Sequence, residues 1–143
     1  MPATSAIIGQ GSKFAIGNGV DGSSTQYPDI SVEITNIPGP ELKRDVHDAT
    51  HLNSPDNYRE FIAGLNGVDP ITLDFNFVPD ASDTLLAHYN VGKGDYQITF
   101  PNGVRLQFSG IPTAWKPGDA TADVMKGSMT IQPSGKPALL APV

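Results

Sequence analysis

Residues 95–110, DYQITFPNGVRLQFSG, decide the fold of this 143-residue chain. Apolar side chains alternate with polar ones on both sides of the central PNG: Tyr96, Ile98 and Phe100 precede it, and Val104, Leu106 and Phe108 follow it. A period of two places alternate side chains on one face of a strand. Because Asn-Gly suits the tight turn between antiparallel strands, the stretch is predicted to be a β-hairpin with one face in a hydrophobic core.

Other stretches predict further strands. The clearest alternation is in ITLDFNFV (71–78), which places Ile71, Leu73, Phe75 and Phe77 on one face. ISVEITNI (30–37) alternates in the same way until PGP (38–40) ends it, because proline donates no ladder hydrogen bond. Shorter strands are predicted at KFAIG (13–17) and around residues 124–132, where Met125, Met129 and Ile131 share a face.

One helix is predicted, over about residues 80–91 of PDASDTLLAHYNVG. Asp80 or Ser82 can cap its first amides, Asp83 suits its positive N-terminal end, and Gly92 can end it. Its buried stripe is expected to consist of Leu85, Leu86 and Tyr89. The last segment, PSGKPALLAPV (133–143), is predicted to be an extended tail, since it is too rich in proline to be a strand or helix throughout.

Composition agrees with a β-rich chain. Gly (15) and Pro (13) are abundant, as expected where short strands need turns. We therefore predict a mainly β fold: a small β-sandwich or barrel of antiparallel strands with one flanking α-helix and a long loop, in one domain over residues 1–143. The net charge of −6 argues against a phosphate-binding surface, and the absence of cysteine excludes disulfides and thiolate chemistry. No secretory signal or membrane span is expected.

The polar stretch at residues 43–67 sustains no period of two or 3.6. Within it, HDATH (47–51) has the two-histidine spacing of zinc proteases, but Asp48 stands where those proteins have glutamate and Pro55 follows closely. Only His88 could add a third imidazole. We therefore interpret the stretch as a solvated loop or an intersubunit contact and expect no metal.

Other motifs also favour ordinary structural roles. GNGVDG (17–22) matches a dinucleotide fingerprint, but SSTQYPD follows it where a helix is required, so we interpret it as a turn. Asp80 and Asp83 are read as helix caps rather than an acid–base pair. Trp115 is expected either to cover the core or to meet a ligand or a neighbouring subunit. The sequence contains no catalytic set, so neither enzymatic activity nor a cofactor is expected.

The segments TLLAHYNVGKGDYQITFPNGVRLQFSGIPTAWK (84–116) and DATHLNSPDNYREFIAGLNGVDPITLDFNF (48–77) resemble tail tube (major tail) proteins of long-tailed, non-contractile bacteriophages of the lambda type, or of related gene transfer agents. The resemblance extends over about residues 30–137 and implies a virion protein made in the bacterial cytoplasm. It further implies rings of six copies that stack into a tube and conduct DNA without binding it specifically. Implied partners are the same chain, a tape-measure protein, and tail terminator or tip proteins; no membrane is implied.

In that family the long segment between early core strands reaches neighbouring subunits and becomes ordered on assembly. The resemblance thus implies an assembly loop at residues 43–67, with these site residues: His47, Asp48, His51, Asn57, Tyr58, Arg59, Glu60 and Phe61. If the strands at 30–37 and 71–78 join the inner wall of a ring, alternation points Glu33 and Asp74 into the lumen.

Two other functions stay open on sequence alone. One is a monomeric β-sandwich binding module, with Trp115 and the loops as its ligand face. The other, ranked last, is a small hydrolase that would use His47, Asp48 and His51.

Overall fold

The computed structural model describes residues 9–20, 22–28, 30, 33–79, 83–120 and 124–142. Two sheets and one α-helix form within these ranges, with a short 3-10 turn, η1 (Pro55–Asn57). The strands are β1 (Lys13–Ile16), β2 (Glu33–Asn36), β3 (Leu42–Asp48), β4 (Phe61–Val68), β5 (Ile71–Asn76), β6 (Gly94–Thr99), β7 (Arg105–Lys116) and β8 (Lys126–Leu140). The helix, α1, spans Thr84–Val91.

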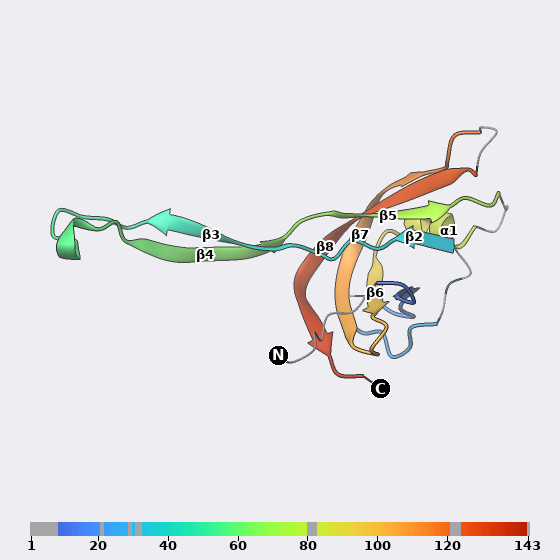
Figure 1. Cartoon of the computed structure of the whole chain (residues 1–143), viewed down its shortest axis with the longest axis horizontal. Coiled ribbons are helices and arrows are strands. Elements are labelled where there is room, and N and C mark those ends of the chain that lie inside the picture. Colours follow the sequence, from blue (N-terminus) through green and yellow to red (C-terminus); the bar gives the residue numbers. More distant parts are fainter. Residues whose placement is uncertain are drawn as a thin grey trace, which may run out of the picture.

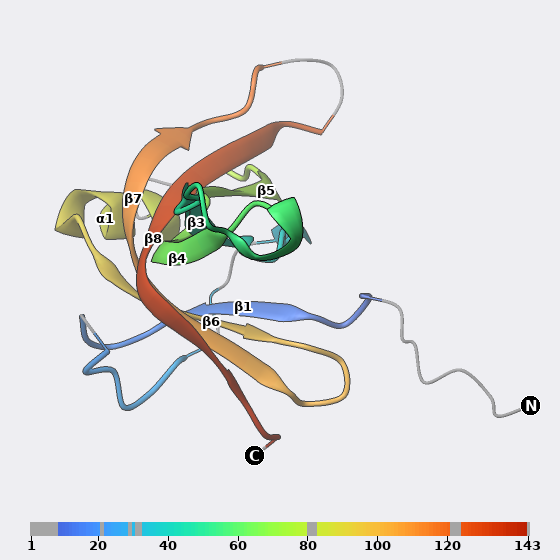
Figure 2. The same ribbon diagram turned by 90° about the vertical axis from the view of Figure 1, so that its left-hand side faces the viewer.

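The molecule has two parts of different shape (Figure 1). Six strands form an antiparallel sheet in the order β1-β6-β7-β8-β5-β2, which coils into a nearly closed barrel with α1 at its side. Strands β3 and β4 form a separate antiparallel ribbon that projects away from the barrel. Figure 2 looks along this ribbon from its tip, with the barrel strands curving behind it. We refer to the ribbon and its tip, Leu42–Val68, as the arm.

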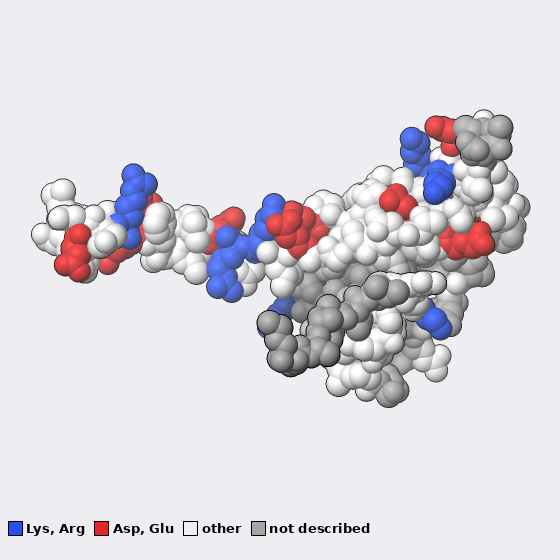
Figure 3. Space-filling view, viewed as in Figure 1, with Lys and Arg blue, Asp and Glu red and all other residues white. Residues whose placement is uncertain are grey.

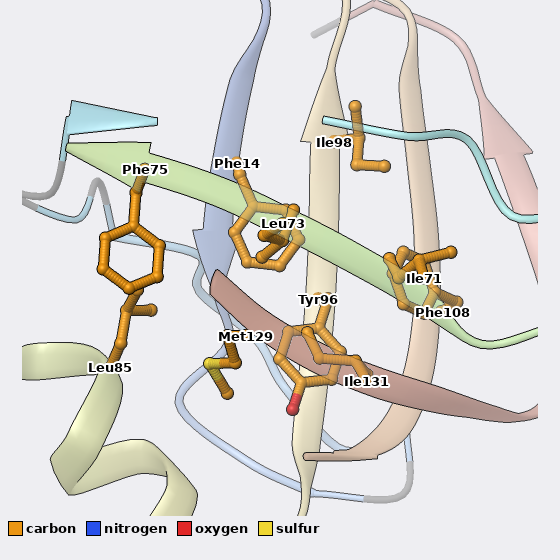
Figure 4. Close-up of a cluster of buried hydrophobic side chains, with 10 residues drawn as sticks. All are labelled: Phe14, Ile71, Leu73, Phe75, Leu85, Tyr96, Ile98, Phe108, Met129 and Ile131. Carbon is orange, nitrogen blue, oxygen red and sulfur yellow. The ribbon is translucent and has the colours of Figure 1, made fainter. Parts of the chain in front are cut away.

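The barrel encloses the hydrophobic core (Figure 4). Leu73 and Phe75 of β5 are at most 1% exposed, and Tyr96 of β6 is fully buried. The Tyr96 ring lies between those of Phe14 and Phe108, with centroid distances of 5.7 and 5.5 Å. Phe14, Tyr96 and Phe108 come from the adjacent strands β1, β6 and β7, so their rings form a row on the inner face of one side of the barrel. The strand order and the single helix confirm the predicted mainly β fold.

The structure confirms the register predicted from alternation. In β5, buried Ile71, Leu73 and Phe75 alternate with exposed Thr72 and Asp74. In the β6–β7 hairpin, Tyr96 pairs with Phe108 and Ile98 with Leu106. Its turn uses Gly103 in a left-handed conformation (φ 90°), and the Asn102 side chain accepts a hydrogen bond from the Val104 N–H. The Asn-Gly pair therefore makes the turn that the sequence favoured.

The helix begins later than predicted. Asp83 is its N-cap, with a side chain that accepts the Leu86 N–H at 3.0 Å, and Gly92 ends it at φ 93°. Asp80 and Ser82, the other predicted caps, lie outside the described residues. Leu85 is fully buried, but Tyr89 is 38% exposed, so its predicted place in the buried stripe is wrong. The helix is too short for a wide apolar stripe. One turn after Leu85, the side chain that contacts the barrel is His88, whose ring meets that of Tyr96.

Two segments predicted to lack strands contain them. The stretch at 43–67 forms most of β3 and β4, in which every residue is exposed or half-exposed. Apolar and polar residues alternate in sequence when one face of a strand is buried, and neither face of this ribbon is buried. The predicted tail at 133–143 is strand as far as Leu140. Pro137 is accommodated because the pairing jumps from Gln107↔Ala138 to Ser109↔Ser134, which leaves a bulge at 135–137, whereas Pro133 pairs with Gly110 within the ladder.

Candidate assembly surface

The arm is anchored at the point where it leaves the barrel. The Gln132 side chain on β8 donates to the Val68 carbonyl at 2.9 Å, and the Asp69 N–H donates to the Glu41 carbonyl at 3.1 Å. Lys43 forms an ion pair with Asp69 at 2.8 Å. The Gln132 bond ties β4 to the barrel sheet, and the two Asp69 contacts hold the chain segments at the base of the ribbon together.

One face of the ribbon exposes several apolar side chains beside the polar pair Arg44↔Asn66. Cross-strand partners share a face of a sheet, and the pairs Leu42↔Val68, Val46↔Ala63 and Asp48↔Phe61 therefore lie together. Val46 is 64% exposed and Phe61 57% exposed. Leaving such side chains in water is unfavourable by about 25 cal/mol for each Å² of apolar surface. An exposed apolar face of this kind is typical of a protein–protein contact.

The tip of the arm is shaped by its own hydrogen bonds. The Thr50 hydroxyl accepts the Glu60 N–H at 2.9 Å, and the Ser54 hydroxyl donates to the Glu60 carboxylate at 2.8 Å. Asp56 and Asn57 both have positive φ, 54° and 61°. Aspartate and asparagine adopt this left-handed conformation more readily than other non-glycine residues, and here they form a tight turn. The tip is thus a built structure rather than the featureless polar loop expected from sequence.

The tip also presents its two large apolar side chains to solvent. Leu52 is fully exposed and Tyr58 is 75% exposed. Hydrogen bonds close around them: Ala49 N–H donates to the Glu60 carbonyl at 2.8 Å, and Tyr58 N–H donates to the Pro55 carbonyl at 3.1 Å. The backbone is therefore ordered while the side chains have nothing to pack against in the isolated chain.

The two histidines of HDATH are engaged differently. His51 accepts the Asn53 N–H on Nδ1 at 3.1 Å, which leaves the proton on Nε2, 3.3 Å from the Glu60 carboxylate. His47 lies on the ribbon over Gly64, whose missing Cβ leaves space for the imidazole. Hydrogen bonds from Thr50 lower the pKa of Asp48. Nowhere in the described ranges do three or more histidine or acidic side chains come together where they could hold a metal ion.

The two acids expected in a lumen lie on the outer side of the barrel sheet. Glu33 is exposed on edge strand β2, and Asp74 is exposed on β5. Strands β2 and β5 pair directly, which brings Asn36 opposite Asp74. Asp74 shares a shallow hollow of about 300 Å³ with Lys116 and Lys126. The outer face is therefore of mixed charge around Asp74, a feature that the strand pattern did not predict.

A buried carboxylate that sequence reasoning missed holds the GNGVDG loop. Asp95 is 1% exposed and accepts hydrogen bonds from the hydroxyls of Ser24 (2.6 Å) and Ser109 (2.7 Å), and from the N–H groups of Gly22 (2.8 Å) and Ser24 (3.1 Å). Burial alone raises the pKa of Asp95, but these hydrogen bonds outweigh it and lower the pKa. The loop is pinned to the barrel, and the fingerprint-like glycines serve a turn. The only signal in the sequence for this hydrogen-bonding role is the position of Asp95 at the start of a predicted core strand.

A second missed contact joins the helix to the sheet. His88 Nε2 lies 2.6 Å from the Tyr96 hydroxyl, with the two rings edge to face. Burial lowers the pKa of His88 and raises that of Tyr96, so both side chains are neutral near pH 7. The pair is therefore a structural hydrogen bond of the core, and the third histidine is not available to HDATH.

Trp115 packs on the barrel. Its ring meets Phe77 edge to face at 5.9 Å, and its Nε1 is buried. This supports the core-covering interpretation over a ligand-stacking one. None of the described helices has the length and apolar character that crossing a membrane requires.

A small barrel that carries an anchored arm with an exposed apolar face and a preshaped tip defines a class of protein: a structural subunit built to contact other chains. The family model described as "Lambda phage tail tube protein, TTP" matches residues 16–140. The chain belongs to this family. It is therefore a structural tail tube protein of a virion or virion-like particle and not an enzyme.

Solved structures of tail assemblies share the fold. A chain in "Virion of native gene transfer agent (GTA) particle" is 14% identical with a TM-score of 0.69, and the match covers 95% of this chain and 100% of that one. A chain in "Tail of empty GTA particle computed with helical refinement, C6 symmetry" is 17% identical with a TM-score of 0.65, covering 90% and 96%. One in "Cryo-EM structure of the anti-feeding prophage (AFP) baseplate, 6-fold symmetrised" is 12% identical with a TM-score of 0.65, covering 90% of each chain. No curated protein sequence matches the chain significantly.

Proposed function

We propose that this chain forms rings of six copies that stack into a tail tube and let DNA pass through the lumen. The observation that carries the proposal is the arm, which exposes Val46, Phe61, Leu52 and Tyr58 on an ordered scaffold. Six-fold symmetry in the descriptions of two similar assemblies supports the ring of six. Contact with neighbouring copies would remove the apolar surface from water, a favourable contribution that the isolated chain lacks.

The arm residues are proposed to act as the assembly element. Phe61 and Tyr58 supply apolar contact area, and aromatic side chains contribute strongly when an interface buries them. His51 and Glu60 hold the tip in shape, as do Asp48, through Thr50, and the turn at Asn57. His47 and Arg59 are exposed and are proposed to meet polar groups of the neighbour. Figure 3 shows charged side chains of both signs along the arm, which suits a directional contact.

Glu33 and Asp74 are proposed to line the channel. Both are exposed on the outer sheet face of adjacent strands, so six copies would place their charges around one wall. Negative charge repels a passing phosphate backbone within about 10 Å at 0.1 M salt. Lys116 and Lys126 beside Asp74 would weaken this repulsion locally, which leaves Glu33 as the stronger contributor. Tape-measure and terminator or tip proteins are the other partners proposed.

Sedimentation velocity and negative-stain electron microscopy of the purified chain test the ring and the tube. We expect rings or tubes of six-fold symmetry that grow with protein concentration. Monomers at every concentration and salt condition would contradict self-assembly and favour a monomeric binding module.

The channel assignment has a separate test. The double variant Glu33→Lys and Asp74→Lys should fold and assemble, because both side chains are exposed, but its tubes should retain DNA and eject it slowly. DNA ejection at the wild-type rate would contradict the assignment of Glu33 and Asp74 to the lumen. A matched control, Asp119→Lys, changes an exposed acid that borders the same hollow.

A further inference from the structure

The base of the arm carries a hollow that no role described so far uses. It has a volume of about 780 Å³ and lies between the start of the ribbon and the bulge of β8. We name it the basal hollow. Its lining includes Leu42, Val68 and Pro137 as apolar surface, and Lys43, Arg44 and Lys136 as charged groups. This volume falls in the range of about 300–1,000 Å³ typical of pockets that take a sizeable ligand.

The basal hollow is electrostatically one-sided. Its lining within the described residues includes three bases and no acid. Lys43 is engaged by Asp69, and the Arg44 Nε donates to the Asn66 side chain at 2.8 Å. Lys136, on the bulge, has no ion-pair partner within the described ranges. The lining of the hollow therefore combines apolar side chains with an excess of positive charge.

The tip of the arm has complementary properties. Residues 48–60 contain three acids, Asp48, Asp56 and Glu60, against one base, Arg59. Leu52 and Tyr58 project from an ordered backbone, as described above. We name these two side chains with Asp56 the tip knob. The knob combines two apolar side chains with an acid, whereas the hollow combines apolar side chains with bases.

We propose that the tip knob of one copy docks into the basal hollow of another copy of the same chain. The inference rests on the self-assembly proposed above and names the surface that receives the arm. The tip and the base of the ribbon are its opposite ends (Figure 1), and the hollow is lined by residues of the base, so the contact joins two different surfaces. Such a head-to-tail contact propagates into rings or helical stacks and does not close into a two-fold dimer.

Cross-linking between two single-cysteine variants tests the contact directly. The chain has no cysteine, so Leu52→Cys and Ser134→Cys each introduce one thiol, in the knob and at the hollow. Both side chains accept the change, because Leu52 is fully exposed and Ser134 is exposed. A short bismaleimide is added to an equal mixture of the variants under assembly conditions. The matched control mixes Leu52→Cys with Glu33→Cys, which lies on the face proposed to line the channel.

Covalent dimers are expected in the Leu52→Cys and Ser134→Cys mixture, at least tenfold above either variant alone and above the control mixture. If wild-type tubes form but the cross-link is absent, or Leu52→Cys cross-links to itself or to Glu33→Cys at equal yield, the docking inference fails while the proposed function stands. If the wild-type chain never assembles, both fail together.

Charge exchange provides a second, independent readout. Lys136→Glu is expected to raise the concentration needed for assembly roughly fivefold, the effect of one rim charge pair. Adding Asp56→Lys in the same chain is expected to restore assembly, because the pair is then reversed. Lys116→Glu, outside the hollow, is the matched control. Equal defects in Lys136→Glu and Lys116→Glu, or no rescue by Asp56→Lys, would overturn the pairing.

Discussion

The barrel and the arm are built from strands of similar regularity but differ in what those strands bury. On β5 of the barrel, Leu73 and Phe75 are at most 1% exposed. On β4 of the arm, Phe61 and Ile62 are more than half exposed although both pair with β3. An isolated two-stranded hairpin is only marginally stable in water. The difference teaches that the barrel strands are held by the core, whereas the arm is held by its ribbon hydrogen bonds and its anchor and leaves its large apolar side chains exposed.

The largest expected effect of a single substitution is a loss of stability in the barrel that the arm does not share. Phe75→Ala should lower the free energy of unfolding by about 3–5 kcal/mol, because it leaves a cavity in the core. The matched change on the arm, Phe61→Ala, should lower it by less than about 1 kcal/mol, because Phe61 is 57% exposed. Urea denaturation followed by circular dichroism measures both. Equal losses would show that the arm belongs to the cooperative fold of the barrel.

The Asp95 contact gives the next largest effect. Asp95→Ala removes the buried acceptor of four hydrogen bonds and leaves their partly buried donors without it, at a cost of about 3 kcal/mol. Hydrogen exchange should show increased opening at residues 17–28 while amides of the arm are unchanged. Faster exchange in the arm would contradict the separation of the two regions.

The same carboxylate predicts how stability depends on pH. The folded-state pKa of Asp95 is lowered, so its contribution is present above its unfolded pKa of about 3.9 and is lost as pH falls through the folded value. Asp95→Asn should therefore flatten the loss of stability below about pH 4. A wild-type acid profile in the variant would show that Asp95 is not the titrating group.

Substitution of two glycines, one in the barrel and one in the arm, is expected to have a smaller effect on stability and compares how tightly the two parts are packed. A Cβ at Gly127 would lie 2.7 Å from the Phe75 ring and 2.8 Å from the Lys116 carbonyl, so Gly127→Ala should cost about 2 kcal/mol. A Cβ at Gly67 meets nothing within 4 Å, and Gly67→Ala should change the unfolding free energy by less than about 0.5 kcal/mol. Thermal unfolding compares the two. A large cost at Gly67 would show that the arm is packed more tightly than its exposure indicates.

The sequence predicted the barrel better than the arm for a physical reason. Alternation at 71–78 and 95–110 follows from one-sided burial, and the structure confirms it at Leu73 and Tyr96. The ribbon at 43–67 buries neither face, so its strands left no such pattern. The prediction that this stretch serves assembly came from the resemblance to tail tube proteins and not from any pattern in the sequence. The Asp95 bonds and the basal hollow join residues distant in sequence, which one sequence read by pattern does not reveal.

The central claim, that the barrel folds by itself while the arm assembles it, is tested most directly by trimming the arm. Residues 46–63 are replaced by an Asn-Gly turn that joins Asp45 to Gly64, which keeps the anchored base of the ribbon. Sedimentation velocity and microscopy then compare the trimmed chain with wild type at equal concentration. The account predicts a folded monomer whose unfolding free energy is within about 1 kcal/mol of wild type and which forms no tubes. Tubes of normal length from the trimmed chain, or a chain that no longer folds, would contradict it.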